Sequence, residues 1–182
     1  YAECHGLAQE TARAHLNAHY ERHSGTLNWY CLDFWSSELA LDIVQLKEEV
    51  VHLIAVRPDV PAFLQALRVS KRRVVMVTNA HPKSLDLKMR ETGIDAYFDA
   101  LISSHQVGLP KEHPDFWQGL QAIESFDRQR TLFVDDSLPV LKSAQAYGIA
   151  HLLAVCNPDS KQPHKDCGDF MEITSFEQVM PD

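Results

Sequence analysis

The stretch RTLFVDDS, Arg130–Ser137, joins an apolar run to a pair of adjacent carboxylates. The residues TLFV have the composition of a buried strand, and Asp135 and Asp136 follow them directly. Two ionised carboxylates so close repel each other, and burial makes each of them more costly. The pair therefore predicts that a cation or a shared proton lies at the end of this strand.

A second stretch of the chain follows the same plan. Residues 72–94, RRVVMVTNAHPKSLDLKMRETGI, and residues 130–149, RTLFVDDSLPVLKSAQAYGI, both run from an apolar strand through a polar loop into a helical pattern. Each strand is a near-continuous apolar run, which is typical of a strand buried on both faces of a parallel sheet. Each helix ends at a glycine, Gly93 or Gly148, where a left-handed residue is favoured.

The rest of the chain from about residue 57 also alternates strands with helices. Further strands are expected at residues 100–104 and 151–156, helices at residues 59–69, 114–124 and 175–180, and a long exposed loop at residues 157–169. Such alternation is typical of an α/β protein in which helices cover both faces of the sheet. The sequence therefore predicts an α/β fold, a doubly wound parallel sheet, over residues 57–182.

Residues 1–56 differ in character from the rest of the chain. They contain no convincing strand, and three stretches, AQETARAHLNAHYERH, TLNWYCLDFWSSEL and DIVQLKEEVVHLIA, favour helix. The stretch VRPDVP, residues 56–61, separates this part from the predicted sheet. We therefore expect a small helical module at residues 1–56.

The composition is that of an ordinary globular protein. The 182 residues, 45% hydrophobic and 23% charged, suffice for one core and a small extra module. A formal net charge of −8 argues against nucleic acid as a partner, because binding it requires clustered Lys and Arg. No apolar run approaches the roughly 20 residues that span a bilayer, so we expect no membrane partner and a cytoplasmic location.

The cysteines give no sign of a metal ribbon or a disulfide framework. Four are present, without CxxC spacing: Cys4, Cys31, Cys156 and Cys167. Reduced thiols are therefore expected.

Polar side chains follow three of the expected strands. Thr78 and Asn79 follow VVMV, Asp135 and Asp136 follow TLFV, and Asn157 follows LLAVC. In open α/β sheets, ligands bind beyond the carboxyl ends of the strands. These groups are therefore expected to converge.

A lysine and a helix start complete a candidate phosphate site. Lys111, in the loop VGLPKEHPDFW, is expected at the same edge, where its ammonium would neutralise phosphate. Thr78 can donate its hydroxyl to a phosphate oxygen, and the backbone amides of Asn79 and Ala80 can bind the anion. Thr78 and Lys111 are the candidate catalytic residues.

The acidic pair is the candidate metal site. Asp135 and Asp136 would hold Mg²⁺, which prefers a few carboxylates together with water and a substrate oxygen. Plainer interpretations exist for each feature: a cap and turn at Thr78, a solvent-facing Lys111, and helix capping by the acidic pair. Their order and shared placement favour a binding site.

Three of these stretches resemble the motifs of a known family. VVMVTNAHP, VGLPKEHPDFW and TLFVDDS are similar, in that order, to the second, third and fourth motifs of the haloacid dehalogenase (HAD) superfamily. The resemblance implies a HAD-like Rossmannoid core, a helical cap and a Mg²⁺-dependent phosphatase in which Asp136 is the better candidate for a direct metal ligand. TLNWYCLDFWSSELALDI, TNAHP and NPDS further resemble the bacterial GMP/IMP nucleotidase branch, which removes the 5′-phosphate from purine mononucleotides.

The first motif of that superfamily has no match in this sequence. Its members carry, at a strand end, a DxDGT-like motif whose first Asp is the nucleophile and whose second is the general acid/base. The resemblance therefore implies a nucleophile upstream of Tyr1, an N-terminally incomplete cap at residues 1–56 and a core at residues 57–182 that lacks its first strand. We expect a further N-terminal segment to complete the sheet, and the 182 residues alone to be inactive.

The cap offers candidates for substrate contact. Four aromatic residues could stack on a purine or could simply pack the helices, with the first two as the substrate candidates: Trp29, Tyr30, Phe34 and Trp35. Three histidines spaced four apart could bind a metal, although exposed side chains on a cap helix are the simpler interpretation: His15, His19 and His23.

Other functions fit parts of the pattern. A HAD phosphatase for another small phosphomonoester would keep the whole site. A dehalogenase of small haloacids needs no Mg²⁺ and tends not to carry adjacent acids in the fourth motif. A receiver-type signalling domain places its acidic pair first in the chain, and here the order is reversed. A catalytically silent HAD-fold binding protein agrees with the absent nucleophile but does not explain the retained Thr78, Lys111 and acidic pair.

Overall fold

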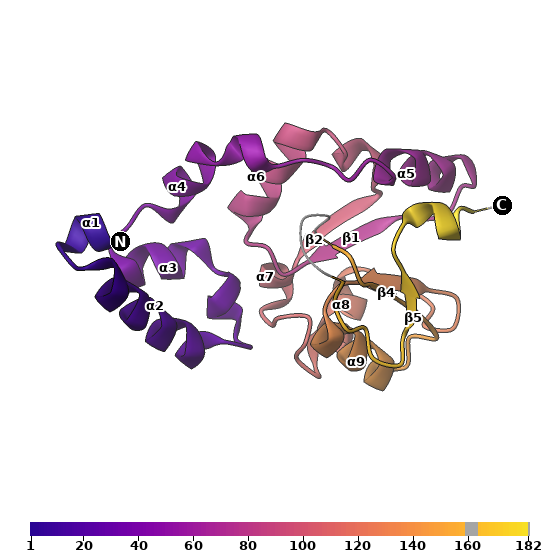
Figure 1. Cartoon of the computed structure of the whole chain (residues 1–182). Coiled ribbons are helices and arrows are strands. Elements are labelled where there is room, and N and C mark those ends of the chain that lie inside the picture. Colours follow the sequence, from indigo (N-terminus) through magenta and orange to yellow (C-terminus); the bar gives the residue numbers. More distant parts are fainter. Residues whose placement is uncertain (159–163, 182) are drawn as a thin grey trace.

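The computed structural model describes residues 1–158 and 164–181. Residues 1–56 form helices only, as expected, and Figure 1 shows α1 to α4 to one side of the sheets. The elements are α1 (Ala2–His5), α2 (Gln9–His23), the 3₁₀ helix η1 (Leu27–Tyr30), α3 (Leu32–Leu39), α4 (Ile43–Glu49) and the 3₁₀ helix η2 (Val51–Leu53).

The remainder of the chain alternates strands with helices. Its elements are α5 (Val60–Val69), β1 (Val75–Thr78), α6 (Pro82–Thr92), η3 (Asp95–Tyr97), β2 (Ala100–Ser103), α7 (Ser104–Val107), α8 (Phe116–Ile123), β3 (Leu132–Asp135), α9 (Leu138–Tyr147), β4 (His151–Val155), β5 (Met171–Ile173) and η4 (Phe176–Val179). The predicted α/β class is confirmed.

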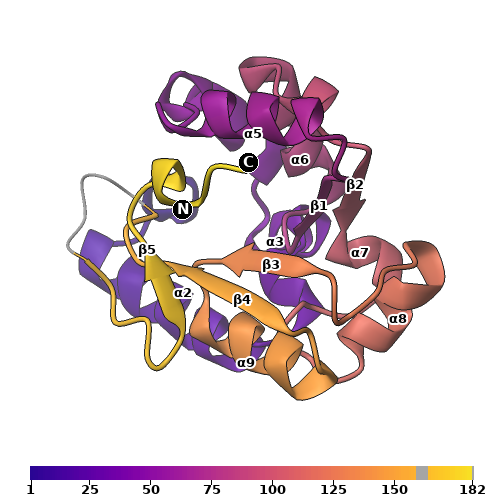
Figure 2. The ribbon, with the colours of Figure 1, turned by 90° about the vertical axis from the view of Figure 1, so that its right-hand side faces the viewer.

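The strands form two parallel sheets. In one, β1 pairs with β2 and places Thr78 opposite Ser103. In the other, the order is β3-β4-β5, with Asp135 opposite Ala154. Within the part of the chain that the structure describes, no ladder joins β1 to β3, and Figure 2 shows the two sheets as separate groups. Hydrogen bonding therefore stops between the two strands that carry Thr78 and Asp135.

Apolar side chains cover both faces of the strands. Phe133 of β3 packs into a cluster with α8 and α9, which contains the buried Phe116, Trp117 and Leu120. The next residue, Val134, packs on the opposite face with residues of β4, β5 and η4. Apolar contacts on both faces agree with the near-continuous apolar runs in the sequence. The residues of β1 and β3 are nevertheless only partly buried, and Leu132 is exposed.

Local signals fix the loops that carry the polar groups. The helices α6 and α9 end at Gly93 and Gly148, both with positive φ, as the sequence predicts. Pro82 occupies the start of α6, and His81 Nδ1 accepts the backbone N–H of Lys83 at 3.3 Å. The chain therefore turns sharply after Thr78 into a capped helix.

Several boundaries differ from those predicted. Ser104 begins α7 instead of ending a strand, because Ser103 and Gln106 form a capping box. The strand β5 was not predicted, since it has only three residues and one buried side chain, Ile173. The end of the chain forms the short 3₁₀ helix η4 instead of an α-helix. Part of the expected loop at residues 157–169 lies outside the described residues.

The prediction of four reduced thiols is wrong. Cys156 and Cys167 form a disulfide, with Cα atoms 5.8 Å apart. The chain returns after β4, where the backbone N–H of Lys165 donates to the carbonyl of Cys156 at 2.8 Å, and this return brings the two cysteines together. Cys4 and Cys31 are free. The two cysteines are 11 residues apart and belong to no recognised cysteine motif, so the sequence did not indicate that they pair.

None of the helices in residues 1–158 and 164–181 is long and apolar enough to cross a membrane.

Candidate functional site

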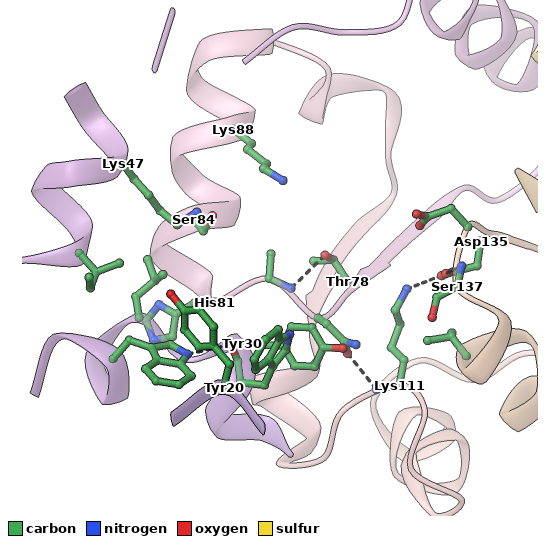
Figure 3. A pocket seen from close by; sticks show the side chains of 18 of the residues that line it. Tyr20, Tyr30, Lys47, Thr78, His81, Ser84, Lys88, Lys111, Asp135 and Ser137 are labelled. Carbon is green, nitrogen blue, oxygen red and sulfur yellow. Dashed lines mark hydrogen bonds and ion pairs between the residues drawn. The ribbon is translucent and has the colours of Figure 1, made fainter. Parts of the chain in front are cut away.

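A cavity of about 680 Å³ lies where the helices of residues 1–56 face the carboxyl ends of β1 and β3. Figure 3 shows its polar groups, with Lys111 and Asp135 at one end and His81 and Tyr30 toward the other. The residues that line it are Tyr20, Trp29, Tyr30, Leu32, Trp35, Leu39, Ile43, Lys47, Thr78, Asn79, Ala80, His81, Ser84, Lys88, Lys111, Asp135, Asp136, Ser137 and Val140. All eight candidate site residues are among them, whereas Asn157, which was also expected to converge here, is not.

The turn after β1 holds the candidate phosphate-binding groups. Thr78 is the last residue of β1, and its Oγ1 accepts the backbone N–H of Ala80 at 3.1 Å. Asn79 is buried, and its Oδ1 accepts the backbone N–H of Lys111 at 2.8 Å. These bonds fix the turn and attach the loop of Lys111 to it.

Lys111 and Asp135 form a buried ion pair. The Lys111 ammonium donates to Oδ2 of Asp135, and the two side chains are only 10% and 7% exposed. Oδ1 of the same carboxylate accepts the backbone N–H of Ser137 at 2.9 Å. The Lys111 ammonium also lies 5.6 Å from the ring centroid of Phe133. The ammonium is therefore held at the strand end and faces the cavity.

Asp136 lies in a more open position than its neighbour. Its side chain is about half exposed, and Oδ2 accepts a hydrogen bond from Lys165 Nζ at 3.2 Å. Both oxygens of Asp135 are engaged by Lys111 and Ser137, whereas Asp136 has only the Lys165 contact among the residues described. Of the two carboxylates, Asp136 is the one accessible to a cation in the cavity.

Glu112 connects the helices of residues 1–56 to the turn after β1. Tyr30 Oη donates to Oε1 of Glu112 at 2.8 Å, and Asn79 Nδ2 donates to Oε2 at 2.8 Å. Burial, together with this carboxylate partner, raises the pKa of Tyr30 to about 12. Sequence reasoning missed Glu112, and its position beside Lys111 was the available signal.

The cap aromatics both pack together and line the cavity. Trp35 Nε1 donates to the carbonyl of Trp29 at 2.9 Å, and Tyr20 meets both indole rings edge to face. Trp35 is buried, whereas Trp29 is partly exposed, and Phe34 is not part of the cavity wall. Packing therefore accounts for Trp35, and Trp29 and Tyr30 keep surface that a ligand could reach.

Two lysines missed by sequence reasoning also line the cavity. Lys47 of α4 and Lys88 of α6 approach it from the two sides, as Figure 3 shows. Burial lowers the pKa of Lys47, and the charge of Lys88 adds to this effect. Each lies in an ordinary amphipathic helix pattern, which gave no sign of a site.

The three spaced histidines of α2 do not form a metal-binding group in the described structure. His19 Nδ1 lies 2.9 Å from a carboxylate oxygen of Glu38, and His23 packs edge to face against Phe34. Only His15 is exposed, as the simpler interpretation expected, whereas His19 and His23 are partly buried.

The fold and the site together define a class of protein. A parallel α/β core brings a threonine, a lysine and two aspartates to one cavity beneath a group of helices. The family model for haloacid dehalogenase-like hydrolases matches residues 8–148. The chain belongs to the haloacid dehalogenase-like hydrolase family and is an enzyme of the hydrolase class.

Similar proteins support this assignment. The GMP/IMP nucleotidase YrfG of Escherichia coli is 36% identical over 176 residues, which cover 97% of this chain and 79% of that protein. The pyrimidine 5′-nucleotidase YjjG of Escherichia coli is 26% identical over 108 residues, 57% of this chain and 48% of its own length. The crystal structure of an HAD phosphatase from Thermococcus onnurineus superposes with a TM-score of 0.78 at 23% identity, covering 98% of this chain and 82% of that one.

Proposed function

We propose that the protein is a Mg²⁺-dependent phosphomonoesterase, a 5′-nucleotidase that acts on purine mononucleotides such as GMP and IMP. The convergence of Thr78, Lys111 and the acidic pair on one cavity carries this proposal. The 36% identity to a protein named as a GMP/IMP nucleotidase supports the choice of substrate. In this proposal, residues 1–56 are the cap and residues 57–182 the core.

The groups at the end of β1 bind the phosphate. Thr78 donates its hydroxyl to one phosphate oxygen, and the backbone amides of Asn79 and Ala80 bind a second one. The Ala80 amide donates to Thr78 Oγ1 in the structure, so it would exchange that oxygen for the phosphate. Lys111 neutralises the phosphate and the attacking carboxylate together, because its ammonium is desolvated and fixed by Asp135. Electrostatic stabilisation by positioned groups of this kind is commonly the largest contribution to catalysis.

The acidic pair fits a hard cation. Two carboxylates face one cavity, and the more open one, Asp136, retains room for a direct bond, while Asp135 contributes directly or through water. Mg²⁺ bound here would supply charge stabilisation for the phosphate oxygens. Lys165 would move from Asp136 as the ion binds.

The nucleophile of this reaction is an aspartate that the 182 residues do not provide. We place it on a strand between β1 and β3, because no ladder joins these two strands among the described residues. Thr78 and Asp135, the last residues of β1 and β3, both line the cavity. Its carboxylate attacks phosphorus, the nucleoside leaves with a proton from a second acid of the same segment, and water then hydrolyses the aspartyl phosphate.

The cap side of the cavity suits a purine base. Trp29 and Tyr30 offer partly exposed rings at the end remote from Lys111, and aromatic faces stack on bases without requiring a particular sequence of polar contacts. The volume of about 680 Å³ falls within the usual range for small-molecule sites. A cytoplasmic location remains our prediction and agrees with such a substrate.

The test is phosphate release by the product of the complete gene, measured with GMP, IMP and CMP. Activity on GMP and IMP is expected with Mg²⁺, lost with EDTA and restored by excess Mg²⁺. Asp136→Asn should lower kcat/KM by at least about 10²-fold, since several kcal/mol of charge stabilisation depend on the metal. Asp86→Asn, an exposed carboxylate of α6 outside the cavity, is the matched control.

Other outcomes identify other functions. Release of chloride from 2-chloropropionate without Mg²⁺ would replace the proposal with a dehalogenase. Equal activity on many sugar phosphates, with none on nucleotides, would replace the purine substrate but keep the phosphatase. Binding of GMP with no turnover under any of these conditions would indicate a silent binding protein.

A further inference from the structure

A thiol and two imidazoles meet where the cap helices contact the core. Cys31 lies between η1 and α3, His81 precedes α6, and His105 lies in α7. Their potential ligand atoms all lie within 4.8 Å of one another. His81 is buried and the other two side chains are partly buried. Three residues that are far apart in the sequence thus present metal-binding atoms to one point.

His105 provides a nitrogen that has no hydrogen-bond partner. The hydroxyl of Ser103 donates to the carbonyl of Ala80 at 2.7 Å, so its oxygen is left to accept from His105 Nδ1 at 3.3 Å. The proton of the neutral ring therefore sits on Nδ1, and Nε2 carries a lone pair. Nε2 is buried and has no partner among the described residues. A buried acceptor of this kind costs free energy unless a donor or a cation satisfies it.

The surroundings favour neutral imidazoles, which are the form that binds metal. His81 Nδ1 accepts the Lys83 N–H, so the proton of its neutral ring lies on Nε2, and a metal bound at Nε2 would displace that proton at the expense of the Lys83 bond. Burial lowers the pKa of both His81 and His105. The two rings meet edge to face, with their centroids 4.9 Å apart. The bond from His105 Nδ1 to Ser103 is the kind of outer contact that orients a ligating histidine.

A carboxylate lies beside this group. Oδ2 of Asp33 is 3.6 Å from His81 Nε2, and its Oδ1 accepts from Lys83 Nζ at 2.6 Å. One sulfur, two imidazole nitrogens and one carboxylate are the donor types found together in tetrahedral zinc sites. Asp33 is not among the groups whose ligand atoms all lie within 4.8 Å of one another. It would therefore have to rotate toward Cys31 and His105, and leave Lys83, to fill the fourth position.

We propose that Cys31, His81 and His105 form a Zn²⁺ site, with Asp33 as the fourth ligand. Ligand atoms around tetrahedral zinc lie about 3.3–3.6 Å apart, from the usual bond lengths of 2.0–2.3 Å. Side-chain rotations that bring the three atoms closer by about 1 Å would reach this geometry from the 4.8 Å limit observed. The thiol and imidazole donors select a borderline metal, whereas the carboxylates at Asp135 and Asp136 suit Mg²⁺.

The two sites are separate. His81 lies toward the opposite end of the cavity from Lys111 and Asp135 (Figure 3). Cys31 and Asp33 belong to residues 1–56, and His81 and His105 belong to the rest of the chain. A bound zinc ion would therefore tie the helices of residues 1–56 to the core beside the phosphate-binding turn.

Cobalt substitution tests the site directly. Co²⁺ is added to the chelator-stripped product of the complete gene with the Cys156–Cys167 disulfide left intact, so that these two sulfurs cannot bind the ion. Absorption is recorded from the near ultraviolet to the visible. The site should give one thiolate-to-cobalt charge-transfer band and tetrahedral visible bands at one ion per chain, and one equivalent of Zn²⁺ should abolish both. Excess Mg²⁺ should leave them unchanged.

Two variants and a control make the assignment specific. Cys31→Ser should remove the charge-transfer band. It should fold normally, because the sulfur accepts the Phe34 N–H at 3.4 Å and a serine oxygen can cap α3 in its place. His105→Gln should weaken Zn²⁺ affinity at least about tenfold. Loss of an outer-shell partner already has an effect of this size, and His105 is proposed as a direct ligand. Cys4→Ser, at the exposed free cysteine, should match the unmodified protein. A band that survives Cys31→Ser, or Zn²⁺ affinity unchanged in His105→Gln, would overturn the proposal.

Discussion

The buried pair of Lys111 and Asp135 should respond to mutation very differently from an exposed pair. Both side chains are at most 10% exposed, so neither charge can regain water when its partner is removed. Breaking such a pair typically costs about 3–5 kcal/mol. We therefore expect Lys111→Met to lower the free energy of unfolding by about 4 kcal/mol. With a urea m-value of about 2 kcal/mol/M, the unfolding midpoint should fall by about 2 M.

The assay is urea unfolding at pH 7 with EDTA, followed by tryptophan fluorescence, since Trp117 is almost completely buried. Lys83→Met is the matched control, because Lys83 and Asp33 form an ion pair with side chains 53% and 59% exposed. Exposed pairs contribute about 0–1 kcal/mol, so its midpoint should move little.

A double-mutant cycle separates the pair from its surroundings. Asp135→Asn keeps an oxygen for the Ser137 N–H, so it removes mainly the charge. The double variant should be less destabilised than the sum of the two single variants by at least about 1.5 kcal/mol, as usual for residues in direct contact. Additive effects, or a loss of less than about 1 kcal/mol in Lys111→Met, would refute the reasoning.

Three further predictions concern the site, the cap and the disulfide. Thr78→Val should lower kcat/KM on GMP by about 10²-fold, the usual effect of losing one positioned donor. Thr131→Val, at a partly buried residue outside the cavity, should leave it unchanged, and equal values would exclude a role for the Thr78 hydroxyl. Tyr30→Phe should cost about 1.5–3 kcal/mol of unfolding free energy at pH 7, since the hydrogen bond goes to a charged acceptor. The pKa of Tyr30 rises on folding from 10.0 to about 12, so the stability that its hydroxyl contributes is complete below pH 10 and is lost as the pH rises toward 12. Between pH 10 and 12 the free energy of unfolding should therefore fall less steeply with pH in Tyr30→Phe than in the unmodified protein. Parallel plots of this free energy against pH would contradict the raised pKa of Tyr30. Reduction of the Cys156–Cys167 disulfide should cost about 2–4 kcal/mol, and a thiol count in denaturant without reductant should give two reactive groups, not four.

The convergence of the site could be predicted because it follows from general rules of sheets. Parallel strands bring their carboxyl ends to one edge, so polar residues that follow VVMV and TLFV had to lie near each other once both were recognised as buried strands. Lys111 could be placed at the same edge because its loop follows a third predicted strand, at residues 100–104. The roles assigned to these residues remain predictions.

The missed features depend on contacts between distant parts of the chain. Glu112 binds Tyr30, 82 residues away, and Cys31 meets His81 and His105 only after the cap helices pack on the core. The disulfide depends on the return of the chain after β4, and β5 pairs through backbone groups with little apolar pattern. None of these contacts produces a periodic pattern of apolar residues, so the sequence alone could not indicate them.

The carboxylate of Glu112 has a mechanical consequence for catalysis. It holds Tyr30 with one oxygen and, through Asn79, the loop of Lys111 with the other. Coupling between two binding events is reciprocal, so an anion that orders the Lys111 loop strengthens the grip on Tyr30 by the same free energy. Phosphate that stays bound after hydrolysis would then stabilise the contact between Glu112 and the helices of residues 1–56. In the proposed reaction, release of the phosphate would therefore be coupled to loosening of the contact between Glu112 and Tyr30.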